Sequence, residues 1–145
     1  MPAEQSMANH ARFFPPFHFL MAPVLIVNLF VQLYWMKDFG LTFRGIFGPL
    51  VALALLAGFV ACRLSALIVQ DRLIRLEEQL RYARLLPADL QARIGEFTIS
   101  QYVSLRFASD AELPALARKV LDGKMQNRKE IKQMIQHWRP DYIRA

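Results

Sequence analysis

The stretch "VACRLSALIVQDRLIRLEEQLRYARLLP", residues 60–87, passes from a wholly apolar sequence to a charged one with no glycine or proline before Pro87. Its first residues end an uncharged run of 18 residues between Arg44 and Arg63. A helix of roughly 20 apolar residues is long enough to span a bilayer. The sequence therefore predicts a helix that leaves the membrane near Arg63 and continues into water instead of ending at the interface.

A second apolar run lies upstream, near residues 17–36, and it contains no Asp, Glu, Lys or Arg; His18 is its only side chain that titrates near neutral pH. Aromatic residues gather at both of its ends, as they do at the two interfaces of a spanning helix. No cleavage site of small residues follows it, so we expect an uncleaved span and not a signal peptide. The loop before the second span, near 45–63, is too short for a folded domain, which predicts a transmembrane hairpin.

The basic residues are distributed unevenly along the chain. Of its 18 Lys and Arg residues, 15 lie from Arg63 onward, against two in the loop 37–45. Positive charge close to a span marks the cytoplasmic side, so we expect a multi-pass inner-membrane protein with both termini in the cytoplasm. The expected segments are a lead (1–16), the hairpin (17–63), an amphipathic extension (64–87) and a helical domain (88–145).

Beyond the second span, apolar residues repeat with alternating gaps of three and four, which is the a/d pattern of a coiled coil. We call four of them the seam: Val69, Leu73, Leu76 and Leu80. Leucine side chains gain nothing from exposure to water, so the pattern predicts that something covers the seam. Either the terminal helices of the same chain fold back over it, or a second copy pairs with it as a short parallel coiled coil, with Arg72 and Glu77 at g and e positions.

Two polar residues of the first span, Asn28 and Gln32, are four residues apart and therefore share a helix face. We expect them to hydrogen-bond to the second helix or to a partner; the alternative is that they line a polar path. In the second span, Ala54, Gly58 and Cys62 form a stripe of small residues that lets helices approach closely. Cys62 is the only cysteine, so an internal disulfide is excluded.

The terminal segment predicts short helices separated by glycine and proline, with no strand pattern. Ser109 with Glu112, and Asn127 with Glu130, stand at the spacing of a capping box. The last of these helices is expected to run to Trp138. The candidate core residues of this domain are Phe107, Ile131, Ile135 and Trp138. The predicted fold class is an all-α membrane protein: a two-helix transmembrane hairpin, a second helix extended into the cytoplasm and a small C-terminal helical bundle.

Four stretches resemble a family of small bacterial membrane proteins that is known only as a domain of unknown function. They are "ANHARFFPPFHF" (8–19), "VQDRLIRLEEQLRYARLLP" (69–87), "LRFASDAELPAL" (105–116) and "IKQMIQHWRPDYIR" (131–144). The resemblance implies two N-terminal spans and a cytoplasmic helical tail. It implies no activity and no functional residues.

The sequence contains little that predicts catalysis. The histidines His10, His18 and His137 lack metal-ligand spacing, and no glycine-rich phosphate loop occurs. We therefore expect no metal, cofactor, small-molecule substrate or enzymatic activity. Residues 88–145 carry 10 Lys and Arg against 7 Asp and Glu, too mixed a surface to favour nucleic acid.

The sequence favours a membrane-anchored interaction or scaffold subunit that contacts lipids and either itself or another membrane or cytoplasmic protein. One alternative is an accessory subunit of a transporter or channel with Asn28 and Gln32 in the path. Another is a membrane-tethered tail that binds lipid or nucleic acid, for which the basic cluster is Lys124, Arg128, Lys129 and Lys132.

Overall fold

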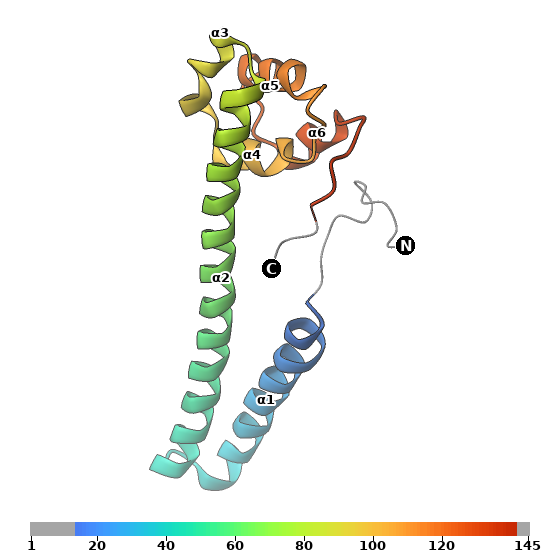
Figure 1. Cartoon of the computed structure of the whole chain (residues 1–145). Coiled ribbons are helices and arrows are strands. Elements are labelled where there is room, and N and C mark those ends of the chain that lie inside the picture. Colours follow the sequence, from blue (N-terminus) through green and yellow to red (C-terminus); the bar gives the residue numbers. More distant parts are fainter. Residues whose placement is uncertain (1–13, 142–145) are drawn as a thin grey trace. The chain divides into compact units, whose positions relative to one another are not determined.

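In a computed structural model of the chain, residues 14–141 are described, and they form helices joined by short turns with no strand among them. The predicted all-helical fold is confirmed. Most of the predicted N-terminal lead, including His10, lies outside the described residues. The elements are a π-helix η1 (Pro16–Met21), α1 (Ala22–Phe39), α2 (Phe43–Leu85), α3 (Ala88–Gln91), a 3₁₀ turn η2 (Ile94–Glu96), α4 (Ile99–Leu105), α5 (Leu113–Asp122) and α6 (Arg128–Gln133) (Figure 1).

The long helix α2 is continuous through Arg63, which confirms the prediction that the helix does not end where the apolar run ends. It begins at Phe43, two residues before the predicted span, and Pro49 lies inside it near its start. The described residues divide into two compact units, 14–67 and 68–141, and α2 contributes to both. We describe each unit by itself.

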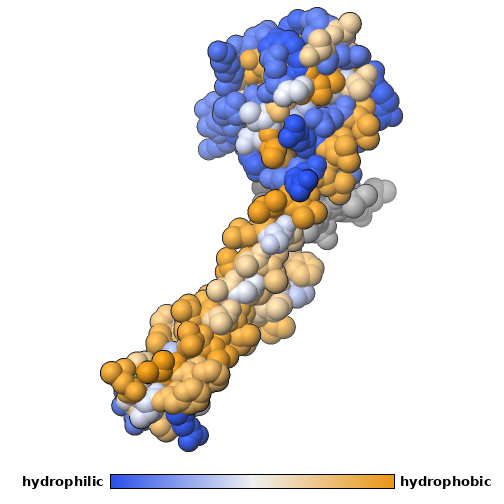
Figure 2. Space-filling model, turned by 90° about the vertical axis from the view of Figure 1, so that its left-hand side faces the viewer, coloured by the Kyte–Doolittle hydropathy of each residue, from blue (hydrophilic) through white to orange (hydrophobic). Residues whose placement is uncertain are grey.

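The hairpin unit, residues 14–67, joins α1 to α2 through a three-residue turn. Gly40 adopts a φ of 58°, a conformation that favours glycine. Thr42 opens α2, because its hydroxyl accepts a hydrogen bond from the Gly45 N–H at 3.3 Å and donates one to the Phe39 carbonyl at 2.9 Å. By length and composition, Pro16–Phe39 and Phe43–Leu85 are both able to cross a bilayer, and Figure 2 shows a mostly hydrophobic surface over this unit.

The tail unit, residues 68–141, is built around the last turns of α2. Tyr82 of α2 packs against Phe97 and Tyr102, with ring centroids 5.2 Å from each. The helices α3 to α6 gather around the last turns of α2 (Figure 1) and contribute buried side chains to the same core. Its buried aliphatic residues include Leu86, Leu90, Leu105, Leu113, Val120 and Leu121.

Side chains cap the N-termini of two helices, α4 and α6. Thr98 and Gln101 form a complete capping box at α4, which sequence reasoning missed although the Thr-x-x-Gln spacing is present. Asn127 caps α6 by accepting a hydrogen bond from the Lys129 N–H at 3.0 Å. Glu130 completes a variant of the expected box, since its carboxylate accepts from the Asn127 side-chain amide and not from the backbone.

The capping role predicted for Ser109 is wrong. The helix α5 starts at Leu113, four residues after Ser109, and Pro114 occupies its first turn, where a missing N–H costs nothing. Of the two hydrogen bonds in the predicted capping box, only one forms: the Ser109 N–H donates to a Glu112 carboxylate oxygen at 3.2 Å.

The prediction that the last helix runs to Trp138 is also wrong, because α6 ends at Gln133. The chain then leaves the helix and pairs with the segment after α4: the Arg139 N–H donates to the Phe107 carbonyl at 2.7 Å, and a single bridge links Ala108 with Trp138. Pro140 favours this departure from the helix, since the residue before a proline avoids helical angles.

Candidate interaction surface

The seam of α2 is open to solvent. Its four side chains are largely exposed: Val69 at 64%, Leu73 at 53%, Leu76 at 55% and Leu80 at 62%. The alternative in which the chain's own terminal helices cover the seam is therefore wrong. A large aliphatic stripe on a charged helix remains without a covering partner among the described residues.

The tail does pack on α2, but on a different face. Ile74, Glu78, Arg81 and Tyr82 are buried there. Their spacing of four, three and one places them on one side of the helix. At about 100° per residue the four seam residues lie on another side of the helix. One face of α2 is therefore covered by the tail and another is free.

Arg81 holds the tail on its face of α2. Its guanidinium donates to a Glu78 carboxylate oxygen at 3.1 Å, to an Asp110 carboxylate oxygen at 2.8 Å and to the Ala108 carbonyl at 2.7 Å. The Arg81 and Glu78 side chains are each only 6% exposed. A buried charge that loses its partner is strongly destabilising, so this cluster fixes which face of α2 the tail occupies.

The electrostatics of this cluster reflect its burial. Burial raises the pKa of Glu78 above its ordinary value, and the neighbouring Arg81 guanidinium opposes that shift. Burial also raises the pKa of the Tyr82 phenol well above its ordinary value. A second ion pair, between Arg128 of α6 and Asp71 of α2 at 3.3 Å, links the tail to an earlier turn of the helix.

Polar and charged residues flank the seam. Arg72, Glu77 and Arg84 are exposed, and Gln70 and Gln79 are half-buried. An apolar centre with a polar rim is the usual composition of a protein–protein interface. The arrangement is suited to helix-on-helix association and offers no set of convergent groups for chemistry.

In the hairpin unit, Gln32 of α1 lies against α2. A Cβ added to Gly48 would come within 2.6 Å of the Gln32 side-chain oxygen, so the absence of a side chain at Gly48 makes room for this contact. Asn28, one turn earlier, is half-buried. The hydrogen bonds expected from Asn28 and Gln32 to the second helix or to a partner stay predictions.

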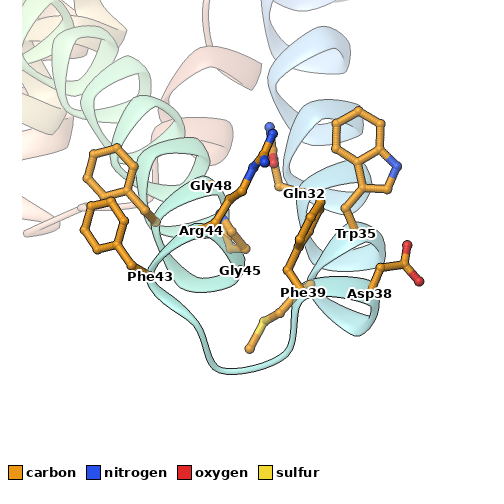
Figure 3. A pocket seen from close by; sticks show the side chains of 11 residues that line it. Gln32, Trp35, Asp38, Phe39, Phe43, Arg44, Gly45 and Gly48 are labelled. Carbon is orange, nitrogen blue, oxygen red and sulfur yellow. The ribbon is translucent and has the colours of Figure 1, made fainter.

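Near the connecting turn, the hairpin encloses a pocket of about 760 Å³ that has Trp35, Phe39 and Gly48 in its lining. The Arg44 and Gln32 side chains point toward one another in it (Figure 3). Sequence reasoning did not single out Arg44. The available signal was its place as the last charge before the uncharged run.

The stripe of small residues is exposed at Ala54, Gly58 and Cys62. A Cβ added to Gly58 would meet no atom within 4 Å, so the stripe does not pack against α1. The first arm of the hairpin contacts α2 through other residues: Phe17 of η1 and Phe59 of α2 stack with ring centroids 4.1 Å apart. For the stripe, packing against another chain stays a prediction.

Of the candidate core residues of the tail, Phe107, Ile131 and Ile135 are buried, and Trp138 is half-buried. The rings of Trp138 and Phe107 have centroids 4.9 Å apart. Trp138 thus reaches the core from the segment that follows α6, and not from one apolar face of a helix. Within residues 14–141, no group of three or more His, Cys, Asp or Glu side chains is placed to hold a metal ion.

These features define an all-helical protein whose long helix has one face covered by a small helical tail and another face open. The chain belongs to a family of unknown function, DUF6526, whose model matches residues 1–145. The family membership expected from the sequence is thereby confirmed, whereas a bacterial origin and a membrane location stay predictions. No curated protein and no solved structure matches the chain.

Proposed function

We propose that this chain is a membrane-anchored interaction subunit without catalytic activity of its own. In this proposal the hairpin of residues 14–67 lies in a bacterial inner membrane, both termini lie in the cytoplasm, and the seam of α2 binds another protein chain. The observation that carries the proposal is the exposure of the seam on a helix whose other face is already covered by the tail.

The energetic argument concerns aliphatic surface. Burying one Val or Leu side chain that was exposed gains about 1.5–3 kcal/mol. A partner that covers Leu73, Leu76 and Leu80 together gains several times this amount, from which the cost of association is subtracted. Monomeric soluble proteins rarely leave such a continuous stripe uncovered.

The two other functions considered have weaker support. A path for a transported solute would need Asn28 and Gln32 to line one cavity, but Gln32 lines the pocket of the hairpin without Asn28. A tail that binds lipid or nucleic acid would use the basic cluster, but Arg128 of that cluster is paired with Asp71.

The proposal is tested with a triple variant, Leu73→Ser, Leu76→Ser and Leu80→Ser, in the full-length chain. We expect it to remain in the membrane after carbonate extraction, but to run as a smaller complex than the unchanged chain in mild detergent. Because the three side chains are exposed, the tail should keep its melting transition. The matched control is Arg75→Ser, which changes an exposed α2 residue outside the seam and outside its polar flanks and should leave the complex size unchanged.

Two results would contradict the proposal. One is extraction of the unchanged chain by carbonate, which would mean that the hairpin is not integrated in a membrane. The other is a complex of the same size for the unchanged chain and the triple serine variant, which would mean that the seam binds no other chain.

A further inference from the structure

We infer that the chain covering the seam is a second copy of this protein, joined to the first through a parallel two-stranded coiled coil of α2. The inference rests on the proposed membrane anchoring, because two copies inserted with the same topology present α2 in the same direction. It goes further than the proposed function by identifying the partner.

The first argument is the register of α2. In the heptad defined by the seam, Leu73 and Leu80 occupy a positions, while Val69, Leu76 and Ala83 occupy d positions. All five are exposed. A two-stranded coiled coil needs a and d side chains that are apolar and available, and this segment of α2 supplies both.

The second argument is what the tail covers. In the same register, Ile74 and Arg81 are b residues, Tyr82 is a c residue and Glu78 is an f residue; all are buried under the tail. In a two-stranded coiled coil the b, c and f positions face away from the partner, so the tail does not obstruct pairing. A bundle of more helices would bring neighbours onto the flanks that the tail already occupies, which favours two strands.

The third argument is charge complementarity. Arg72 is a g residue and Glu77 is the e residue five positions later, and both are exposed. In a parallel pair, a g residue faces the e residue of the next heptad on the other helix. Arg72 of each copy therefore faces Glu77 of the partner subunit, and the symmetry produces this pair twice. The next such pair joins Gln79 to Arg84 of the partner subunit, so like charges do not meet.

The surface is thus complementary to itself in one orientation and one register. Within a single helix, residues five apart do not face each other, so Arg72 and Glu77 gain nothing from this spacing in a single copy. A segment of about two heptads, from Val69 to Ala83, is marginal for a coiled coil alone, but two anchors in one membrane raise the effective concentration of the paired helices.

Cysteine crosslinking of the full-length chain in native membranes tests the inference. In a Cys62→Ser background, Ala83→Cys places a thiol at a d position without removing a seam leucine. We expect oxidation to convert this variant to a disulfide-linked dimer. The matched control, Arg75→Cys, places an exposed thiol at a c position on the outer side of α2, and it should crosslink at least about tenfold more slowly, since its thiols lie beyond disulfide reach.

A charge exchange then tests the register. In the Ala83→Cys background, Arg72→Glu replaces both attractive pairs by like-charge pairs, and crosslinking should slow by about fivefold or more. Adding Glu77→Arg restores opposite charges across the pair and should restore the rate. An antiparallel pair or an unrelated partner predicts no such rescue.

Equal crosslinking of Ala83→Cys and Arg75→Cys, or failure of the double exchange to restore the rate, overturns the inference. If the chain stays membrane-integral and the triple serine variant still loses its complex, the proposed function survives with a different partner. If the triple serine substitution has no effect on complex size, the proposed function fails as well. The two failures are therefore distinguishable.

Discussion

Among single residues, two buried tyrosines differ in what their hydroxyls do. The Tyr102 hydroxyl donates to the Ile94 carbonyl at 2.6 Å, whereas the Tyr82 hydroxyl is buried with no hydrogen-bond partner among residues 14–141. A buried polar group without a partner is unfavourable, and its removal is close to neutral. We expect Tyr102→Phe to cost about 1 kcal/mol of unfolding free energy, and Tyr82→Phe to cost nothing or to stabilise the tail.

Chemical denaturation of the detergent-solubilised chain measures both variants. Trp138 fluorescence in a Trp35→Phe background follows the tail alone. A loss of stability in Tyr82→Phe equal to that in Tyr102→Phe would mean that the Tyr82 hydroxyl has a partner, such as a bound water.

Glu78 gives the tail a specific pH dependence. Because burial raises its pKa in the folded chain, the folded state holds the Glu78 proton more tightly than the unfolded state. Its contribution to stability is present below its ordinary pKa and is lost as the pH rises through the folded-state pKa. Relative to Glu78→Gln, which does not titrate, the unchanged chain should lose unfolding free energy as the pH rises from the ordinary pKa of glutamate through the raised pKa of Glu78. A constant difference between the two chains over this range would contradict the raised pKa.

At the level of secondary-structure elements, α4 depends on its capping box. The Thr98 side chain accepts from the Gln101 N–H, and the Gln101 side chain accepts from the Thr98 N–H at 2.8 Å. Loss of such a cap costs about 1 kcal/mol. We expect that cost for Thr98→Ala and almost none for Thr98→Ser, measured by thermal unfolding of the tail. A loss in Thr98→Ser as large as in Thr98→Ala would indicate that the Thr98 methyl group, and not its hydroxyl, supports α4.

Some features of these helices could be predicted from the sequence and others could not. The continuity of α2 beyond Val60 follows from the absence of glycine and proline between Val60 and Pro87, and the seam follows from its spacing; both are local properties. The face that the tail covers depends on contacts such as that of Arg81 with Asp110, 29 residues away. The end of α6 likewise depends on Glu112, whose carboxylate accepts from the Gln136 N–H 24 residues later. Periodicity along one helix carries no information about such distant partners.

For the molecule as a whole, the testable property is its orientation in the membrane. The excess of basic residues after Arg63 predicts that the turn between α1 and α2 is outside the cytoplasm and that the tail is inside. Gly40 is a poor labelling site because its φ of 58° strains any other residue. Leu41, exposed in the same turn, is the better position.

In intact cells with Cys62 replaced by serine, a membrane-impermeant thiol reagent should therefore label Leu41→Cys and leave Gln126→Cys unlabelled. Opening the cells should make Gln126→Cys reactive, because Gln126 is exposed in the tail. Labelling after the cells are opened is the control, because a thiol that is buried in the protein would stay unlabelled in opened cells too. Labelling of Gln126→Cys in intact cells with protection of Leu41→Cys would invert the topology, and it would place the seam, which is on the tail side of α2, outside the cytoplasm as well. Labelling of neither thiol before opening and of both afterwards would mean that the hairpin does not cross the membrane, since both ends of α2 would then lie on the inner side.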